Sequence, residues 1–286
     1  TETVYGLAAL AKDRVAVARV FEIKGRPSDH PVIVHVAGPT DLRNWGKGVA
    51  DYAVRLAEGL WPGPLTLVVP AADDVPRYLT GGQDTVGLRC PAHPVALAVI
   101  EATGPMAAPS ANRFGQVSPT TAADVVGDIG DRLDPQRDLI LDGGACPVGV
   151  ESTILDCTGD APRVLRWGAV EVEEIERVSG RRVSNGTSAV RAPGGLASHY
   201  APRAEVHLGD HPAPGDGFLA LKQVPTPSGA VRLAEPEDTR AFAAVLYRSL
   251  RDADALGLPA VWAQPPADGS ALAVAVGDRL HRASVR

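Results

Sequence analysis

Two basic side chains stand in a polar loop directly before an apolar segment. Lys24 and Arg26 belong to the Gly- and Pro-containing stretch 24–30, which leads into the β-branched run 31–36. In an extended loop, side chains two residues apart point the same way. A lysine and an arginine arranged so can hold a di- or triphosphate, the lysine as a point charge and the arginine as a fork of donors. For a lone pair of this kind, a solvated turn is the commoner explanation.

A histidine and an arginine accompany two further apolar segments. His35 lies inside the run 31–36 and, taken alone, is more typical of a hydrogen-bonded core histidine than of a ligand contact. Arg89 ends the short strand predicted at 86–88, and its burial would require an anionic partner. A substrate carboxylate and a structural aspartate explain that arginine equally well.

Short hydroxyl and amide side chains form two more groups. Residues 107–112, with the sequence AAPSAN, follow a predicted strand. Their Ser and Asn side chains can hydrogen-bond to an adenine edge, a ribose or a phosphate, although ordinary Asx and Ser turns use the same residues more often. Ser152 and Thr153 interrupt another apolar segment, and Arg166 follows on a neighbouring one. None of these signals is specific by itself.

The common catalytic motifs are missing from the sequence. It contains no Walker-type phosphate loop, no dinucleotide-binding Gly-x-Gly-x-x-Gly, no HExxH and no Gly-x-Ser-x-Gly. Its three cysteines have no CxxC spacing, so they predict neither a disulfide framework nor a zinc site and indicate a reducing compartment. Cys90 and His93 are better explained by packing than by a thiol–imidazole pair, because no third partner is evident. No metal site is predicted.

Composition limits the class of protein. With 286 residues, 45% hydrophobic and 22% charged, the chain is expected to fold into about two globular domains. Its formal net charge of −6 argues against a broad nucleic-acid-binding surface but not against a small anion held by local cations. Its apolar runs are too short to span a membrane and no charged-then-apolar leader opens the chain, so a cytoplasmic protein without a membrane segment is expected.

The elements that must position these side chains alternate along the chain. In the first part, strands are predicted at 31–36, 65–70, 106–108, 138–141, 150–156 and 163–166, and helices at 49–60, 94–102, 120–129 and 170–178. Residues 179–203 are rich in Gly, Ser, Arg and Pro and predict a linker. Beyond it, strands at 205–208, 218–222 and 260–263 alternate with helices at 242–253 and 270–282, which is typical of a small parallel α/β layer.

Together and in this order, the motifs closely resemble those of the YrdC-like family of L-threonylcarbamoyladenylate synthases. The segments that carry the resemblance are TETVYGL (1–7), KGRP (24–27), PVIVH (31–35), WPGPLTLV (61–68), LRCP (88–91), APSAN (108–112), SPT (118–120), GVESTILD (149–156) and VLRWGA (164–169). HYAP at 199–202 and the extra βα domain resemble the long, two-domain form of the family. Compared with the family pattern, the first strand ahead of Thr1 is missing.

The resemblance implies a fold and an activity. The fold would be α/β, a YrdC-like mixed twisted sheet with helices around a concave pocket, plus a small Rossmann-like α/β C-terminal domain. The domains would be a catalytic domain at 1–180, a linker at 181–203 that covers the active site, and the small domain at 204–286. The enzyme would convert L-threonine, bicarbonate or CO2, and ATP with Mg2+ into threonylcarbamoyl-AMP and pyrophosphate. A downstream tRNA threonylcarbamoyl transferase would use this product to make threonylcarbamoyladenosine, and a weak direct contact with tRNA is a further expectation.

Residue by residue, the resemblance also implies a site. The L-threonine side would consist of Thr3, His35, Arg89, Ala108 and Ser152. The ATP side would consist of Arg26, His30, Thr85, Ser110, Asn112, Ser118, Arg166 and Tyr200. Lys24 and Arg26 would stabilise phosphate charge during catalysis, and the linker would close over the nucleotide as a lid. No side-chain nucleophile is required.

Two other functions stay open at this point. One is an RNA-binding module, in which the Lys24 and Arg26 loop would follow a phosphate backbone, although the net charge of −6 argues against it. The other is a carbamoyl-transfer domain on the same fold that would use carbamoyl phosphate instead of threonine. The cysteine pairs that accompany such domains are not in this sequence.

Overall fold

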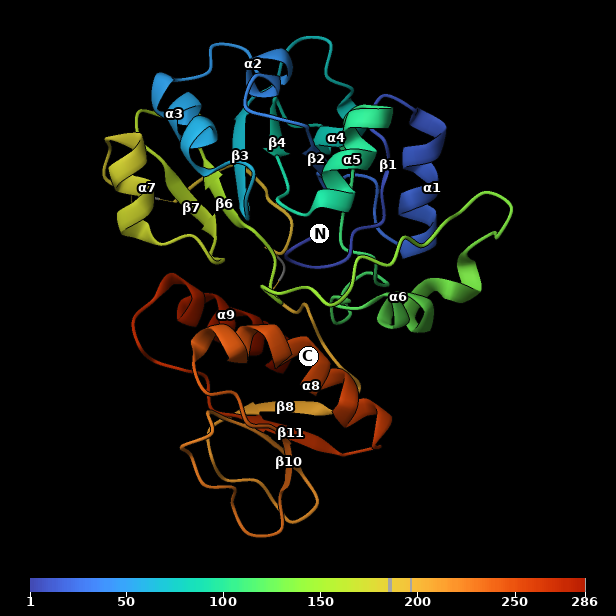
Figure 1. Cartoon of the computed structure of the whole chain (residues 1–286), viewed down its shortest axis with the longest axis vertical. Helices are drawn as coiled ribbons and strands as arrows, with labels where there is room; N and C mark the ends of the chain where they lie inside the picture. Colours follow the sequence, from blue (N-terminus) through green and yellow to red (C-terminus); the bar gives the residue numbers. More distant parts are fainter. Residues whose placement is uncertain (185–186, 196, 286) are drawn as a thin grey trace.

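Two β-sheets organise the chain (Figure 1). The computed structural model describes residues 1–184, 187–195 and 197–285, so three positions of the predicted linker (185, 186 and 196) lie outside the described residues. The larger sheet is mixed, and its seven described strands run in the order β1 (Ala9–Leu10), β5 (Met106–Ala107), β2 (Ile33–His35), β4 (Thr85–Arg89), β3 (Leu65–Pro70), β6 (Thr153–Asp156) and β7 (Arg163–Arg166). β2 pairs in parallel with β4, and β3 with β6, whereas the other neighbours are antiparallel. This confirms the predicted mixed α/β sheet.

Helices surround the larger sheet (Figure 1). They are α1 (Arg14–Lys24), α2 (Asp41–Trp45), α3 (Asp51–Leu60), α4 (Arg77–Thr80), α5 (Pro94–Thr103), α6 (Ala122–Ile129), the 3-10 turn η1 (Gly130–Arg132) and α7 (Val172–Ser179). α3 buries Tyr52, Ala53 and Leu56, the side that its i, i+3, i+4 spacing predicts. α1 was not predicted. It begins after the N-cap Asp13, whose carboxylate accepts from two backbone N–H groups, and ends at Gly25 with φ of 63°.

The strand predicted at Asp138–Leu141 is wrong. In the described part of the chain this segment pairs with no strand, and the side chains of Leu139 and Leu141 are 80% and 47% exposed. Asp138 instead forms an ion pair with Arg19 on α1, in which Oδ2 of Asp138 lies 2.5 Å from Nη2 of Arg19. An apolar run becomes a strand only where a neighbouring edge supplies hydrogen-bond partners, and this run meets none.

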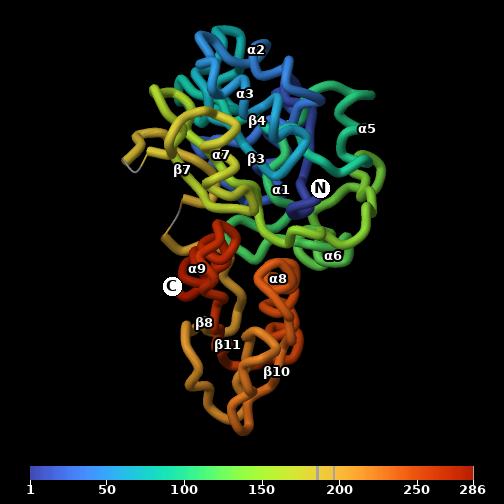
Figure 2. The backbone as a smooth tube through the Cα atoms, turned by 60° about the vertical axis from the view of Figure 1, so that its left-hand side comes forward, coloured from blue at the N-terminus to red at the C-terminus, as the bar shows by residue number. Residues whose placement is uncertain are grey.

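The second sheet is parallel and smaller. Its four described strands run in the order β10 (Val231–Ala234), β9 (Gly217–Leu219), β11 (Ala260–Ala263) and β8 (Glu205–Leu208). β10 is an addition to the predicted set. Two helices, α8 (Thr239–Ala255) and α9 (Ala271–Ser284), lie between this sheet and the first domain (Figures 1 and 2). Both begin at a side-chain N-cap, Asp238 for α8 and Ser270 for α9.

The two domains share a hydrophobic core. Val117 and Val150 of the first domain belong to one buried cluster with Phe242 and Leu246 of α8. Gly149 lies so close to α8 that a Cβ atom there would come within 2.2 Å of the Ala243 carbonyl oxygen. The contact is therefore a packed interface, which fixes the C-terminal domain against the segment that carries Ser152 and leads into β6. Among the described residues, no helix has the length and hydropathy of a membrane span.

Candidate active site

A small polar cavity lies where the N-terminal segment, several strand ends and the linker meet. Its lining includes residues predicted from the sequence on both sides of the expected site: Thr3, Arg26, His35, Arg89, Ala108, Ser110, Ser152, Arg166 and Tyr200. The linker residues Pro193, Gly194 and His199 also line it. Its volume of about 60 Å³ is far below the ~300–1,000 Å³ usual for ligand sites, because the linker closes it.

Arg89 ends β4 at one side of the cavity. Its Nη1 donates to Thr3 Oγ1 at 2.9 Å, and its Nε donates to the Gly63 carbonyl at 3.2 Å. Its Nη2 is 2.6 Å from Glu2 Oε1, but neither that nitrogen nor the Glu2 oxygens has a hydrogen bond of good geometry within the described ranges. Burial would raise the pKa of Glu2, but Arg89 outweighs it and lowers the pKa. The chain thus supplies a glutamate where the sequence suggested a substrate carboxylate or an aspartate, and Arg89 keeps donor capacity for a further anion.

His35 ends β2 directly opposite Arg89 in the sheet register. Its ring is buried, and among the described residues Nδ1 has no hydrogen-bond partner. Burial first, and the nearby Arg89 second, lower the pKa of His35 to about 3, so the imidazole is neutral near pH 7. The fully hydrogen-bonded core histidine favoured by the sequence is therefore wrong. One ring nitrogen remains available at the cavity.

Arg26 also lines the cavity, whereas Lys24, which was predicted with it, is not among the lining residues. The extended loop predicted for them is wrong at Lys24, which is the last residue of α1, and Gly25 turns the chain before Arg26. Lys24 Nζ donates to the carbonyls of Ser110 (2.5 Å) and Asn112 (2.6 Å). Burial, followed by the charge of Arg26, lowers the pKa of Lys24 to about 7. Arg26 Nη2 donates to the Pro31 carbonyl at 2.7 Å, and burial, followed by Arg166, lowers its pKa to about 10.

Arg166 ends β7 and holds the backbone of Ser152. Its Nε and Nη2 donate to the Ser152 carbonyl at 3.1 and 3.0 Å, Nη2 also donates to Ser152 Oγ at 3.1 Å, and Nη1 reaches the linker at the Pro193 carbonyl. Burial lowers the pKa of Arg166. Lys24 and Arg166 are buried and Arg26 is half-buried, and none of the three forms an ion pair with a carboxylate within the described chain. Three neighbouring basic side chains without a protein anion can hold an anionic ligand.

Several predicted residues lie outside the cavity lining. Ser118 donates to Glu151 Oε1 at 2.6 Å. The Asn112 amide donates to two backbone carbonyls, while its buried Oδ1 has no partner in the described ranges. His30 packs edge-on against Phe114, with ring centroids 5.3 Å apart. Thr85 begins β4, four residues before Arg89.

The lining residues that sequence reasoning missed include the ionisable side chains of Glu151 and His199. Burial would raise the pKa of Glu151, but Arg279 and Arg166 outweigh it and hold that pKa at about 2, so the group is a carboxylate. Burial lowers the pKa of His199 to about 4, and its Nδ1 has no partner among the described residues. A carboxylate inside the apolar segment 150–156 was the available signal for Glu151.

The cavity offers no ready metal site. The described residues contain no cluster of three or more His, Cys, Asp or Glu side chains that could hold a metal ion. Of the carboxylates at the cavity, Glu2 faces Arg89 and Glu151 faces Arg279. The residues present therefore do not fit a resident metal ion.

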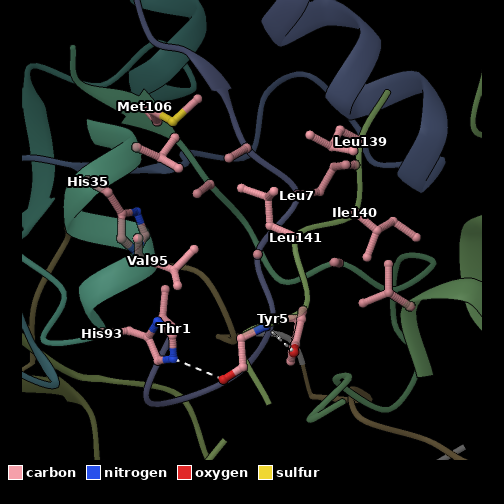
Figure 3. Close-up of a pocket in the computed structure, with 18 of the residues that line it drawn as sticks. Thr1, Tyr5, Leu7, His35, His93, Val95, Met106, Leu139, Ile140 and Leu141 are labelled. Atoms are coloured by element: carbon pink, nitrogen blue, oxygen red, sulfur yellow. Dashed lines mark hydrogen bonds between the residues drawn. The ribbon is translucent and has the colours of Figure 1, made fainter. Parts of the chain in front are cut away.

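A larger apolar cavity of about 390 Å³ lies beside the polar one (Figure 3). Leu7, Met106 and Leu141 point into it, and its lining shares His35 with the polar cavity. At the polar edge of this cavity, the His93 ring already has a hydrogen-bond partner, the Gly143 carbonyl at 3.2 Å. Chemistry on charged substrates therefore belongs to the smaller cavity.

The chain is similar to known proteins. A family model described as "Telomere recombination" matches residues 1–168, and one described as "Threonylcarbamoyl-AMP synthase, C-terminal domain" matches residues 170–285. The threonylcarbamoyl-AMP synthase of Pyrococcus abyssi (strain GE5 / Orsay) is 39% identical over 306 aligned positions, covering 99% of this chain and 88% of that protein. That of Bacillus subtilis (strain 168) is 44% identical over 216 positions, covering 73% and 61%. The crystal structure of P. abyssi Sua5 complexed with L-threonine matches 99% of this chain and 88% of that one, with a TM-score of 0.87 and 39% identity.

Proposed function

Because the chain belongs to the threonylcarbamoyl-AMP synthase family, we propose that its polar cavity condenses L-threonine, bicarbonate or CO2, and ATP into threonylcarbamoyl-AMP and pyrophosphate. The observation that carries this proposal is the group formed by Lys24, Arg26 and Arg166, which are buried or half-buried and pair with no carboxylate in the described chain. A triphosphate supplies the negative charge that the chain leaves out at this point. Arg89, on the other side of the cavity, already faces Glu2, and its remaining N–H donors can bind the carboxylate of an amino acid.

The reaction needs little covalent help from the protein. The threonine amine attacks CO2 and loses a proton to give a carbamate. A carbamate oxygen then attacks the α-phosphorus in line, and the bond to the β-phosphate oxygen breaks to release pyrophosphate. Catalysis therefore consists of holding the two substrates in contact and stabilising phosphate charge. The cysteines fit this scheme as spectators, since all three are buried and burial raises the pKa of Cys90 to about 11.

We assign the threonine side to the group around Arg89, comprising Thr3, His35, Arg89, Ala108 and Ser152. His35, neutral and with one free ring nitrogen, can hydrogen-bond the amine or hydroxyl of L-threonine. We assign the nucleotide side to Arg26, His30, Thr85, Ser110, Asn112, Ser118, Arg166 and Tyr200, with Lys24 and Arg26 acting on the phosphates. Arg26 lies near the like charge of Arg166, and neither pairs with a carboxylate in the described chain, which supports placing the phosphates beside them.

The linker is proposed to act as a lid. Pro193, Gly194 and Tyr200 close the cavity to about 60 Å³, too little for ATP, so they must move when ATP enters. Gly194 has φ of 84°, and a Cβ atom there would come within 2.6 Å of the Tyr200 hydroxyl, so the closed linker depends on this glycine. A closed lid would protect the labile mixed anhydride from water. We place the lid at residues 181–203, between a catalytic domain at 1–180 and a small domain at 204–286.

The remaining partners follow from the reaction. Mg2+ would arrive on the ATP phosphates, because the carboxylates at the cavity already face arginines. Threonylcarbamoyl-AMP would pass to a tRNA threonylcarbamoyl transferase for threonylcarbamoyladenosine formation in tRNA, with no more than a weak contact between this chain and the tRNA. A cytoplasmic location stays a prediction, supported by the three free thiols.

The proposal is tested by measuring pyrophosphate release from the purified chain with Mg2+ and ATP. Release is expected only when both L-threonine and bicarbonate are added. Release that is indifferent to threonine would exclude this function and favour carbamoyl-transfer chemistry. Binding of tRNA with steep salt dependence and no ATP turnover would indicate an RNA-binding module instead.

A second experiment separates the two sides of the cavity. Arg26→Ala is expected to raise the KM for ATP, and Arg89→Ala the KM for L-threonine, each by about tenfold or more for one lost charge-assisted contact. Pyrophosphate release at varied concentrations of each substrate gives both constants. Equal effects of the two variants on both substrates would contradict the assignment.

A further inference from the structure

We propose that Tyr247 and Arg279 of the C-terminal domain are positioning residues for the reaction, because they hold Glu151 and Tyr200 in the wall of the substrate cavity. The inference rests on the proposed function and adds a catalytic role for a domain outside the larger sheet. The cavity itself is lined by Glu151 and Tyr200 but not by Tyr247 or Arg279. The two C-terminal residues therefore act through their neighbours.

Glu151 is held almost entirely by this domain. The Tyr247 hydroxyl lies 3.0 and 2.9 Å from its two carboxylate oxygens, and Arg279 Nε donates to Oε2 at 3.1 Å. Ser118 provides the contact from the first domain, at 2.6 Å. Glu151, Tyr247 and Arg279 are buried, so water cannot take the place of Arg279 beside the Glu151 carboxylate. By holding Glu151, these contacts also restrain Ser152, the next residue along the chain.

Tyr200 is held by the same two residues. Its ring stacks on Tyr247 with centroids 5.7 Å apart and an interplanar angle of 26°, and the Arg279 guanidinium lies 5.4 Å from its ring centroid. Tyr200 has φ of 62°, a left-handed conformation that a bulky residue keeps only when its surroundings enforce it. The C-terminal domain therefore fixes both Glu151, which precedes β6, and a lid residue of the cavity.

Two other contacts join the domains. Arg251 on α8 forms a bidentate ion pair with Asp128, at 2.8 and 2.6 Å. Arg251 also donates to the carbonyl of Val117, next to Ser118, and the charge of Asp128 favours protonated Lys24, so this contact is not independent of the site. Glu171 accepts from the Ala271 N–H of α9 at 2.8 Å and does not line the cavity. Glu171 is thus a matched control that weakens the same interface without touching Glu151 or Tyr200.

The test uses the full chain and four substitutions, with pyrophosphate release measured against each substrate. Tyr247→Phe removes the hydroxyl that binds Glu151 and keeps the ring under Tyr200, so the KM for L-threonine should rise about tenfold while that for ATP stays nearly constant. Tyr247→Leu also removes the ring, so the KM for ATP should rise as well. In a Glu151→Gln background, Tyr247→Phe should have much less effect than alone, because the two changes act on one contact. Glu171→Ala should leave both constants unchanged.

Two results would overturn the inference. Wild-type kinetics in Tyr247→Phe and Tyr247→Leu would mean that the C-terminal domain does not position the cavity. An equal rise of the same KM in Glu171→Ala would mean that loss of interface stability alone explains the effect. Thermal unfolding of each variant checks that the kinetic constants are measured on folded protein. Because every variant is measured beside a wild type whose release depends on threonine, failure of this inference is distinguishable from failure of the proposed function.

Discussion

Arg279 is a buried arginine and Arg26 a half-buried one, and their surroundings are opposite. Arg279 faces the Glu151 carboxylate at 3.1 Å, at the interface between the domains. Arg26 has a carbonyl partner and the like charge of Arg166 nearby, and no carboxylate pairs with it in the described chain. Removing an arginine from water is tolerable when an anion compensates it. For Arg279 the chain supplies the anion and the arginine fixes the structure, whereas for Arg26 we propose that the substrate supplies it.

The largest expected effect is on the paired arginine. Arg279→Met leaves Glu151 buried without its cation, so the free energy of unfolding should fall by about 3–5 kcal/mol. Chemical denaturation followed by tryptophan fluorescence measures this. The double variant Arg279→Met with Glu151→Gln should recover part of the loss, since the orphan charge is gone. If Arg279→Met lost no stability, Arg279 would not be a structural arginine and its contrast with Arg26 would fail.

The unpaired arginine should behave in the opposite way. Arg26→Ala removes a half-buried charge that nothing in the ligand-free cavity compensates, so the free energy of unfolding should stay the same or rise. In the same variant, kcat/KM for ATP should fall by about ten- to a hundredfold, the equivalent of about 1.5–3 kcal/mol for contacts to charged groups. Arg77→Ala, an arginine whose side chain is 66% exposed, is the control and should change neither quantity appreciably. A stability loss in Arg26→Ala as large as that of Arg279→Met would refute the distinction.

The smallest expected effect is a change in the protonation of Lys24 when ATP binds. The pKa of Lys24 falls from 10.5 in the unfolded chain to about 7 in the fold, so between these values the unfolded state holds more protons. The stability contributed by this group is therefore present above pH 10.5 and lost as pH falls to about 7. ATP should raise that pKa, so its binding at about pH 8.5 should take up a fraction of a proton. Calorimetry in buffers of different ionisation enthalpy measures the uptake, and identical uptake in Lys24→Met would show that Lys24 is not its source.

The two kinds of arginine also differ in how far the sequence reveals them. Arg26 and Arg89 stand beside strands in short motifs, so local pattern and family resemblance together lead to them. Their partners were less accessible, since Glu2 was not recognised as the carboxylate facing Arg89. The helix ending at Lys24 was missed as well, because its apolar residues Val17, Val20 and Phe21 were not recognised as one face.

The pairing of Glu151 with Arg279 lies beyond any local pattern. The two residues are 128 positions apart and meet only because α9 packs against the first domain. Glu151 shows a weak signal, a charge between apolar residues, which indicates that a partner is needed but not which one, whereas Arg279 follows Asp278 in a charged stretch and shows no such signal. The strand predicted at 138–141 failed for a related reason, since apolar composition says nothing about whether an edge is available for pairing.

The central claim, that the unpaired cations receive ATP for carbamate transfer, is tested most directly by following the carbon atom. The full chain is incubated with Mg2+, ATP, L-threonine and 13C-bicarbonate, and the nucleotide products are identified by mass spectrometry immediately after mixing. The expected product is threonylcarbamoyl-AMP with the label in its carbamoyl carbon, formed together with pyrophosphate and strongly reduced in Arg26→Ala. Unlabelled AMP or ADP as the only nucleotide product, or labelled product formed equally well by Arg26→Ala, would contradict the claim.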